Sequence, residues 1–243
     1  MKKETVQAAL VIIGDEILSG RTTDKNLNFL ATNLSSFGIN LKEVRVVPDV
    51  ESEIIDAINT VRKKHDYVFT SGGIGPTHDD ITSEAVAKAF GVEIELNQEA
   101  EQILHKYYGV EINEARLKMA RIPQGATLLD NPVSSAPGFR IENVFVMAGV
   151  PKIFQGMFFA AQKELVGGKK TLAKEVRINL VESLIAKDFE DLQQIYPNVA
   201  MGSYPFEGGT SLVFRSIDYD DIDLAIGEMK TRIFAINKDA ILD

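Results

Sequence analysis

The first half of the chain alternates short apolar runs with segments whose apolar residues recur at helical spacing. Residues 8–13, 41–47 and 66–70 have the composition of strands. The first run is apolar throughout, as expected for a parallel strand covered on both faces. This β-α-β-α-β-α order predicts a parallel sheet with helices on both of its faces. The helical faces are Leu27, Leu30, Ala31 and Leu34; Ile54, Ile55, Ile58 and Val61; and Ile81, Ala85, Val86, Ala89 and Phe90.

Residues 97–165 continue the same unit with less regular patterning. Two helices are predicted within 97–120, followed by a Pro/Gly-rich loop over 131–139. The loop is longer than a simple connection requires, which is typical of binding loops. Residues 139–147 predict a hairpin or edge strand and then a central strand. Pro151 suits the first position of the helix that follows.

The pattern changes after the Gly167-Gly168-Lys169-Lys170 segment, which we interpret as a linker. Val176, Ile178 and Leu180 alternate with polar residues, as in a half-exposed strand. A helix, two strands near 199–204 and 211–217, and a final amphipathic helix follow. We therefore predict two domains, residues 1–167 and a small α+β domain of split-βαβ type over 171–243.

Composition narrows the functional classes. Of 243 residues, 45% are apolar and 25% are charged, as in ordinary globular proteins. The net charge of −9 argues against nucleic acid or an anionic membrane as a partner. The chain has no cysteine, which excludes disulfides and thiolate chemistry and fits a cytoplasmic location. Neither a signal peptide nor a membrane-spanning run is expected.

The glycine-rich stretch after the third predicted strand is the strongest candidate for chemistry. Ser71 is followed by Gly72-Gly73-Ile74-Gly75, and a helix is predicted to begin near residue 81. Glycines let backbone N–H groups approach a ligand, and a helix N-terminus attracts anions, so this turn predicts a phosphate site. Thr77 and Ser71 offer hydroxyl donors. The stretch lacks the ending of a P-loop, and glycines are also common in ordinary turns.

Two adjacent carboxylates, Asp79 and Asp80, stand at the start of the predicted helix. They would repel a phosphate unless a divalent cation lay between them, so we expect a hard cation such as Mg²⁺. His78 is either a general base or a partner of these acids. The alternative is that one aspartate simply caps the helix.

A second polar segment follows the first predicted strand. Asp15 and Glu16 come directly after it, and Asp24, Asn26 and Asn28 follow within one short loop and the start of a helix. Right-handed crossovers would place the first and third strands side by side, so both acidic segments would share one crevice. The alternative for Asp24 is a helix cap.

Taken together, these motifs resemble the MoCF (molybdopterin-binding-like) domain. They are Gly14 to Gly20 with Asp24 and Asn26, Gly72 to Thr82, the loop from Asn131 to Gly138, and Gly149-Val150-Pro151. The likeness is greatest to the competence/damage-inducible protein A (CinA-like) family and to the N-terminal domain of eukaryotic FAD synthase. It departs from that pattern at Ser134, at Ala148 and at Lys152-Ile153.

The resemblance implies a three-layer α/β/α fold with a mostly parallel sheet, followed by the small α+β domain. It implies metal-dependent hydrolysis of a nucleotide pyrophosphate such as ADP-ribose or FAD, without a deamidase domain. The alternatives are molybdopterin binding or adenylation, and a non-catalytic nucleotide-binding module. The expected partners are a nucleotide or pterin ligand and further copies of the chain.

The expected catalytic residues are Asp80, Asp79, Asp15 and Glu16, and Asp79, Asp80 and Asp15 are expected to hold Mg²⁺, Mn²⁺ or Co²⁺. The expected ligand-binding residues are Ser71, Gly72, Gly73, Gly75, Thr77, Asp24, Asn26, Asn28, Pro137, Gly138, Gly149 and Pro151.

Overall fold

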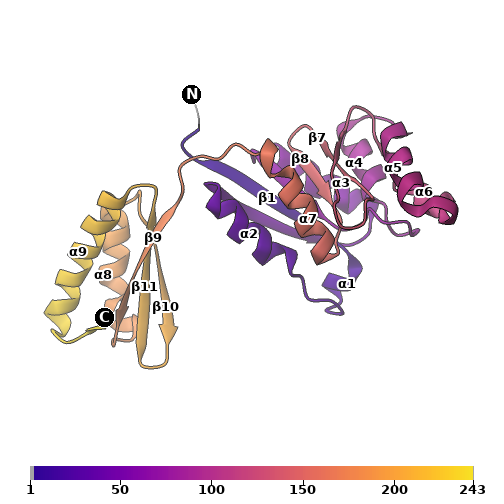
Figure 1. Cartoon of the computed structure of the whole chain (residues 1–243). Coiled ribbons are helices and arrows are strands. Elements are labelled where there is room, and N and C mark those ends of the chain that lie inside the picture. Colours follow the sequence, from indigo (N-terminus) through magenta and orange to yellow (C-terminus); the bar gives the residue numbers. More distant parts are fainter. Residues whose placement is uncertain (1–2, 243) are drawn as a thin grey trace. The chain divides into compact units, whose positions relative to one another are not determined.

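The computed structural model describes residues 3–242. Its internal contacts divide the chain into two compact units, Met1–Gly168 and Lys169–Asp243 (Figure 1). Each unit has its own hydrophobic core. No helix within the described range is long and apolar enough to cross a membrane.

The first unit is built on a six-stranded sheet in the order β2-β1-β3-β8-β7-β6. The strands β1 (Val6–Ile13), β2 (Ile39–Val47), β3 (Tyr67–Ser71) and β8 (Val144–Met147) run parallel. At the other side, β7 (Gly138–Ile141) is antiparallel to both β8 and β6 (Thr127–Leu129). The predicted pairing of the first and third strands is confirmed, since β1 lies between β2 and β3.

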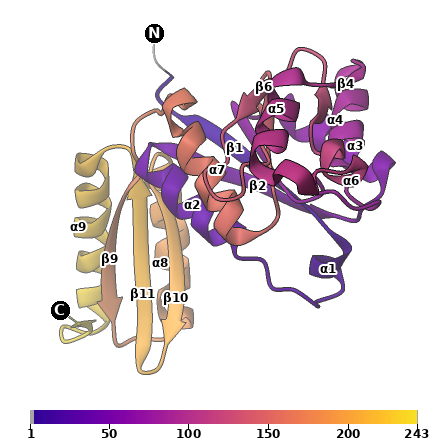
Figure 2. The same ribbon diagram turned by 45° about the vertical axis from the view of Figure 1, so that its right-hand side comes forward.

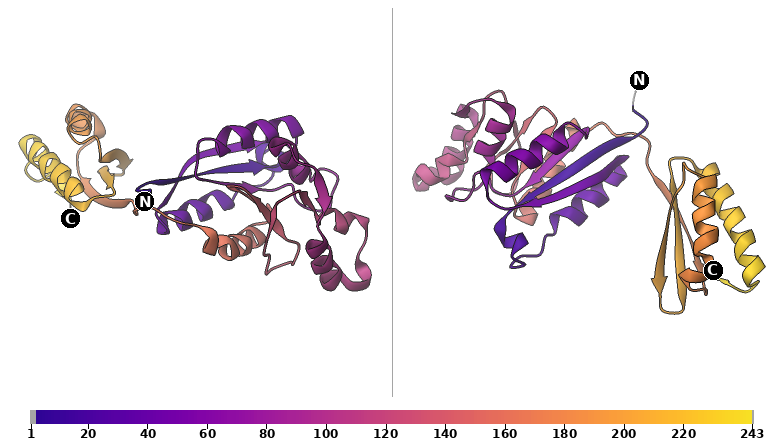
Figure 3. Two further views of the ribbon diagram at one scale, coloured as in Figure 1. Left: turned by 90° about the horizontal axis from the view of Figure 1, so that it is seen from above. Right: turned by 180° about the vertical axis from the view of Figure 1, so that it is seen from behind.

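Helices cover both faces of this sheet (Figure 3, left). On one face, α2 (Asn26–Ser36) and α7 (Pro151–Ala161) pack over the side chains of Ala8, Leu10 and Ile12. On the other, α3 (Glu51–Arg62) and α4 (Thr82–Phe90) pack over the alternate side chains of β1. Because both faces are buried, β1 is apolar along its whole length. The predicted three-layer α/β/α fold is confirmed.

Several short elements differ from the sequence prediction. The polar segment after β1 contains a one-turn helix, α1 (Asp15–Leu18). Two strands that we did not predict, β4 (Ile94–Leu96) and β5 (Arg121–Pro123), pair antiparallel and enclose residues 97–120. Between them lie α5 (Gln98–Tyr108), a 3₁₀ turn η1 (Gly109–Glu111) and α6 (Glu114–Lys118). A second 3₁₀ turn, η2 (Gln162–Glu164), follows α7. Strands of two or three residues are too short to show a hydrophobic period.

The second unit has the order β9 (Leu172–Ile178), α8 (Glu182–Ile195), β10 (Ala200–Phe206), β11 (Gly209–Ser216), α9 (Tyr219–Ile236) and β12 (Ile241–Leu242). Its antiparallel sheet has the order β10-β11-β9-β12, and both helices cover one face (Figure 2). The small α+β domain is confirmed. The two-residue strand β12, which we did not predict, completes the split-βαβ arrangement.

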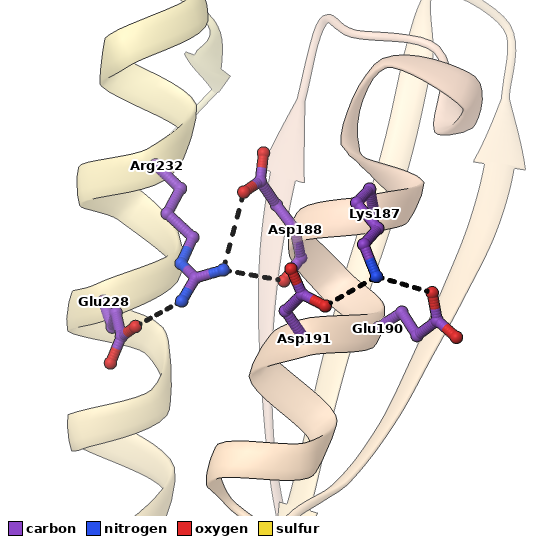
Figure 4. A network of polar contacts seen from close by, with 6 residues as sticks. All are labelled: Lys187, Asp188, Glu190, Asp191, Glu228 and Arg232. Atoms are coloured by element: carbon purple, nitrogen blue, oxygen red, sulfur yellow. Dashed lines mark hydrogen bonds and ion pairs between the residues drawn. The ribbon is translucent and has the colours of Figure 1, made fainter.

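A polar network joins α8 to α9 (Figure 4). The guanidinium of Arg232 contacts Glu228 at 2.6 Å and Asp188 at 3.5 Å. The ammonium of Lys187 contacts Asp191 at 2.9 Å on the exposed side of α8. Since Arg232 is the more buried of the two cations, it is the one expected to contribute to the packing of the helices.

Candidate functional site

A cavity of about 510 Å³ lies at the carboxyl ends of β1, β3 and β8. This is the size range of small-molecule sites, and strand ends are where ligands bind in open parallel sheets. The lining combines carboxylates, a glycine turn and an apolar wall. It consists of Ile13, Gly14, Glu16, Asp49, Gly72, Gly73, Ile74, Gly75, Pro76, Asp79, Asp80, Tyr108, Met119, Asn131, Ser134, Ala136, Ala148, Gly149, Val150, Ile153 and Met157.

The turn after β3 passes very close to the end of β1 and to the start of α4, and glycine allows this approach. Gly72 has a φ of +115°, and a Cβ there would lie 2.2 Å from the carbonyl oxygen of Ile13. Gly73 has a φ of +70°, and its Cβ would lie 2.1 Å from Oγ1 of Thr82. That hydroxyl donates to the carbonyl of Gly72 at 3.0 Å and fixes the turn against the start of α4. Only glycine allows this backbone path.

The turn offers backbone donors to the cavity. Within residues 3–242, the amide N–H groups of Gly73, Ile74 and Gly75 donate to no protein acceptor, and all three residues line the cavity. The amide of Gly72, by contrast, donates to the carbonyl of Met147 at 3.1 Å. Consecutive unpaired amides beside a helix start are suited to an anion such as a phosphate.

Asp80 shapes the loop that follows the turn. Its Oδ2 accepts hydrogen bonds from the amide of Thr77 at 2.8 Å and from the Thr77 hydroxyl at 2.5 Å. A Cβ on Gly75 would lie 2.6 Å from the same carboxylate oxygen. From α6, the ammonium of Lys118 donates to the carbonyls of Thr77 and Asp80, each at 2.7 Å. One carboxylate oxygen of Asp80 is therefore committed to the loop, while the residue still lines the cavity.

Asp79 also lines the cavity, and its carboxylate is 62% exposed. The pKa of Asp79 is held below its usual range, first by the hydroxyl of Thr77, which can turn its one proton to either Asp79 or Asp80, and then by a backbone amide, so Asp79 is ionised at neutral pH. His78 is 98% exposed, and its Nδ1 lies 3.9 Å from Asp79. It does not line the cavity.

Asp49 is a site residue that the sequence analysis missed. It follows β2, lines the cavity and accepts a hydrogen bond from the amide of Asp15 at 3.0 Å. Burial raises the pKa of Asp49, and the charges of Asp15, Asp79 and Asp80 raise it further. The acids after β1, β2 and β3 are thus close enough to repel one another. Asp15 and Glu16 were predicted because they follow a predicted strand. Asp49 also follows one, so the same signal could have identified it.

Asp24, Asn26 and Ser71 line a separate cavity of about 50 Å³ that borders the main one. The carboxylate of Asp24 accepts a hydrogen bond from the amide of Leu27 at 2.8 Å, so Asp24 caps the start of α2. Asn26 is buried, and its Nδ2 donates to Oγ of Ser71 and to the carbonyl of Gly149, both at 2.8 Å. Asn26 therefore joins the start of α2 to the ends of β3 and β8, whereas Asp24 only caps α2.

The remaining predicted residues are spread more widely. Glu16 and Gly149 border both cavities, and Pro151 borders the smaller one as the first residue of α7. The other predicted residues lie outside both cavities. Asp15, Asn28 and Thr77 are exposed. Pro137 borders a third cavity of about 270 Å³, and Gly138 packs within β7 against the Val146 carbonyl.

The loop over 131–137 is held by Asn131. Its Nδ2 donates to Oγ of Ser134 at 2.7 Å and to the carbonyl of Ala136 at 2.8 Å. All three residues line the main cavity. Ser134 and Ala148, two of the departures from the family pattern, therefore both lie at the cavity surface.

The carboxylates do not form a closed metal cage. Across residues 3–242, no three histidine, aspartate or glutamate side chains are grouped so as to hold a metal ion by themselves. Mg²⁺ is often bound by one or two carboxylates together with water and the substrate's phosphates. The donor set of Glu16, Asp49, Asp79 and Asp80 beside unpaired amides fits a cation shared with a phosphate ligand.

Comparisons with known proteins agree with this architecture. Residues 9–165 match the family described as a probable molybdopterin binding domain, and residues 170–238 match the middle domain of FAD synthase. A protein of Archaeoglobus fulgidus is 31% identical over 221 residues, which cover 91% of this chain and 95% of that one. The structure of the protein CinA from Thermoplasma acidophilum is 34% identical, with a TM-score of 0.63 over 67% of this chain and 99% of that chain.

A longer relative is a CinA-like protein of Sulfurihydrogenibium sp., which is 36% identical over 201 residues. The matched region covers 77% of this chain and 50% of that protein. The present chain therefore corresponds to about half of this relative.

Proposed function

This chain belongs to the MoCF family of probable molybdopterin-binding domains, and from the chemistry of its cavity we propose that it binds a nucleotide and hydrolyses its pyrophosphate with the help of a divalent cation. ADP-ribose and FAD are the substrates of this class that we propose first. The observation that carries the proposal is the meeting of unpaired amides and four carboxylates in one cavity of about 510 Å³. Amides alone suit an anion, and carboxylates beside them require a cation between.

The glycine turn would hold the phosphate oxygens through the amides of Gly73, Ile74 and Gly75. Asp79, which is ionised at neutral pH, would hold the cation with at most one further carboxylate of the cavity, and water and the phosphate oxygens of the ligand would supply the other ligands. A bound Mg²⁺, Mn²⁺ or Co²⁺ would neutralise phosphate charge and lower the pKa of a coordinated water. Lys118 would keep Asp80 in place by binding the carbonyls on either side of the loop. Asp15 and His78, which line neither cavity, are not assigned a direct role.

The test is a product assay. Purified protein would be incubated with ADP-ribose and FAD, with each of the three cations or with a chelator, and released AMP would be measured. We expect cation-dependent AMP release that falls at least about a hundredfold in Asp79→Asn, because one ligand charge is lost. Asp56→Asn is the matched control, since Asp56 is 79% exposed on α3. Full turnover with chelator present, or in Asp79→Asn, would contradict the proposal.

The second candidate function is molybdopterin binding, which the family description favours, with adenylation as the reaction that could follow it. A pterin phosphate would occupy the same turn. Incubation with ATP and molybdopterin, followed by analysis for an adenylated pterin, separates this reaction from hydrolysis. Binding of either ligand without any product would instead favour a non-catalytic module. Self-association also stays a prediction, to be measured by sedimentation.

A further inference from the structure

The lining of the cavity includes an aromatic ring and a methionine besides its carboxylates. Tyr108 is the last residue of α5 and Met119 directly follows α6, and both line the cavity with the glycine turn. They are half-buried against a small core of Ala100, Leu104 and Ala120. The sequence pattern places residues 97–120 in helices but gives no sign that they reach the strand ends.

The ring of Tyr108 is held in place before any ligand binds. The guanidinium carbon of Arg116 lies 4.2 Å from the centre of the Tyr108 ring, and the ring of Tyr107 packs edge-on at 4.9 Å. Arg116 in turn donates to the carbonyl of Glu111. A side chain that is already immobilised loses little conformational entropy when a ligand packs on it.

Lys118 connects the segment of Tyr108 and Met119 to the loop after the glycine turn. It precedes Met119, and its ammonium binds the carbonyls of Thr77 and Asp80 in the loop after the glycine turn. Direct contacts therefore tie the segment of Tyr108 and Met119 to the loop that carries Asp79 and Asp80. A ligand that fills the cavity would meet both the unpaired amides of the glycine turn and the side chains of Tyr108 and Met119.

We infer that Tyr108 and Met119 receive the planar heterocyclic ring of the ligand while the glycine turn receives its phosphates. The inference rests on the proposed function in taking the ligand to be a phosphate compound, but it does not require turnover. Aromatic rings stack on flat heterocycles, and methionine sulfur packs favourably against them. The ligand class is thus a ring-bearing phosphate, a nucleotide or a pterin, and excludes ring-free polyphosphates and sugar phosphates as preferred ligands.

The experiment compares a ring-bearing with a ring-free ligand. Dissociation constants for ADP-ribose, FAD and inorganic pyrophosphate would be measured by calorimetry on the full chain in the presence of Mg²⁺. Tyr108→Leu removes the ring but keeps an apolar side chain against the small core. This variant is expected to weaken the binding of ADP-ribose and FAD about tenfold and to leave the dissociation constant of pyrophosphate within twofold. Tyr108→Phe is expected to retain most of the affinity for ADP-ribose and FAD. Tyr219→Leu is the matched control, since Tyr219 is exposed, belongs to the second unit and does not line the cavity.

Met119→Ala provides a second variant that does not depend on the folding of Tyr108→Leu. It is expected to weaken the binding of ADP-ribose and FAD but not that of pyrophosphate. Equal losses for pyrophosphate would mean that these residues only support the loop, and would overturn the inference. So would unchanged affinity for ADP-ribose and FAD, or a wild-type protein that binds them no more tightly than pyrophosphate. Selective binding without AMP release would instead refute the proposed hydrolysis and leave this inference standing.

Discussion

Asn26 offers the sharpest test of how the site is assembled. It is 1% exposed, and its Nδ2 joins the start of α2 to the ends of β3 and β8 through Ser71 and Gly149, both at 2.8 Å. The carbonyl of Gly149 can only accept a hydrogen bond, so the amide orientation of Asn26 is fixed by its partners. Replacing this side chain tests whether one buried amide holds a helix start and two strand ends together.

The expected magnitudes follow from the two hydrogen bonds. Asn26→Ala removes both, and at about 1 kcal/mol each the free energy of unfolding should fall by about 2 kcal/mol. Asn26→Asp is nearly the same shape but places a carboxylate oxygen against the Gly149 carbonyl. An uncompensated buried charge raises the loss to about 4 kcal/mol at pH 7. The isosteric substitution is therefore expected to be worse than the truncation.

The two variants also differ in their dependence on pH. Burial and the facing carbonyl should raise the pKa of the introduced carboxyl in the folded state above its unfolded value of about 3.9. The penalty is then fully present above the folded pKa. It is relieved as the pH falls towards the unfolded pKa, because the protonated group can donate to the carbonyl. Asn26→Asp should thus approach or exceed Asn26→Ala in stability on acidification.

Urea unfolding of both variants and the wild type at pH 7 and at pH 5 measures these differences. Asn33→Asp is the matched control, since Asn33 lies on the same helix and binds a local carbonyl. The reasoning would be refuted if Asn26→Asp were as stable as the wild type at pH 7, or if its deficit relative to Asn26→Ala did not shrink at the lower pH.

Three further substitutions test other parts of the structure. Gly72→Ala should lower the free energy of unfolding in urea by about 3 kcal/mol, because its Cβ would meet a backbone oxygen at 2.2 Å. Gly20→Ala is the control: Gly20 has a φ of +72° but open space around it, so the loss should be about 1 kcal/mol. Asp49→Asn should stabilise the ligand-free protein at pH 7 by less than about 1 kcal/mol, because the raised pKa of Asp49 means that folding disfavours its charged form. That gain should vanish as the pH falls below the unfolded pKa. The same substitution should abolish turnover, because it removes a carboxylate of the cavity. Arg232→Met should lower the free energy of unfolding, measured by calorimetry, by about 1 kcal/mol because it leaves its carboxylate partners unpaired. Lys187→Met, whose side chain is 78% exposed, should have a smaller effect.

The sequence by itself determined the architecture, because its signals are local and repeated. A fully apolar run such as residues 8–13 has few alternatives to a buried parallel strand, and each such run is followed by an apolar helical face. The glycine turn was also legible, since consecutive glycines between a strand and a helix have a direct backbone meaning. The very short strands β4, β5, β6 and β12 carry no period, so pairing partners alone decide them.

The tertiary structure decided which polar residues meet. Asp49 and Glu16 lie 33 positions apart and share a cavity only because β1 and β2 end at the same edge of the sheet. Lys118 reaches the loop of Asp80 across 38 positions. Asn26 looks like a ligand donor in the sequence, but its amide nitrogen is used by two partners inside the protein. Spacing along the chain encodes secondary structure, whereas contacts across a parallel sheet depend on how distant strands are ordered, and no local pattern records that order.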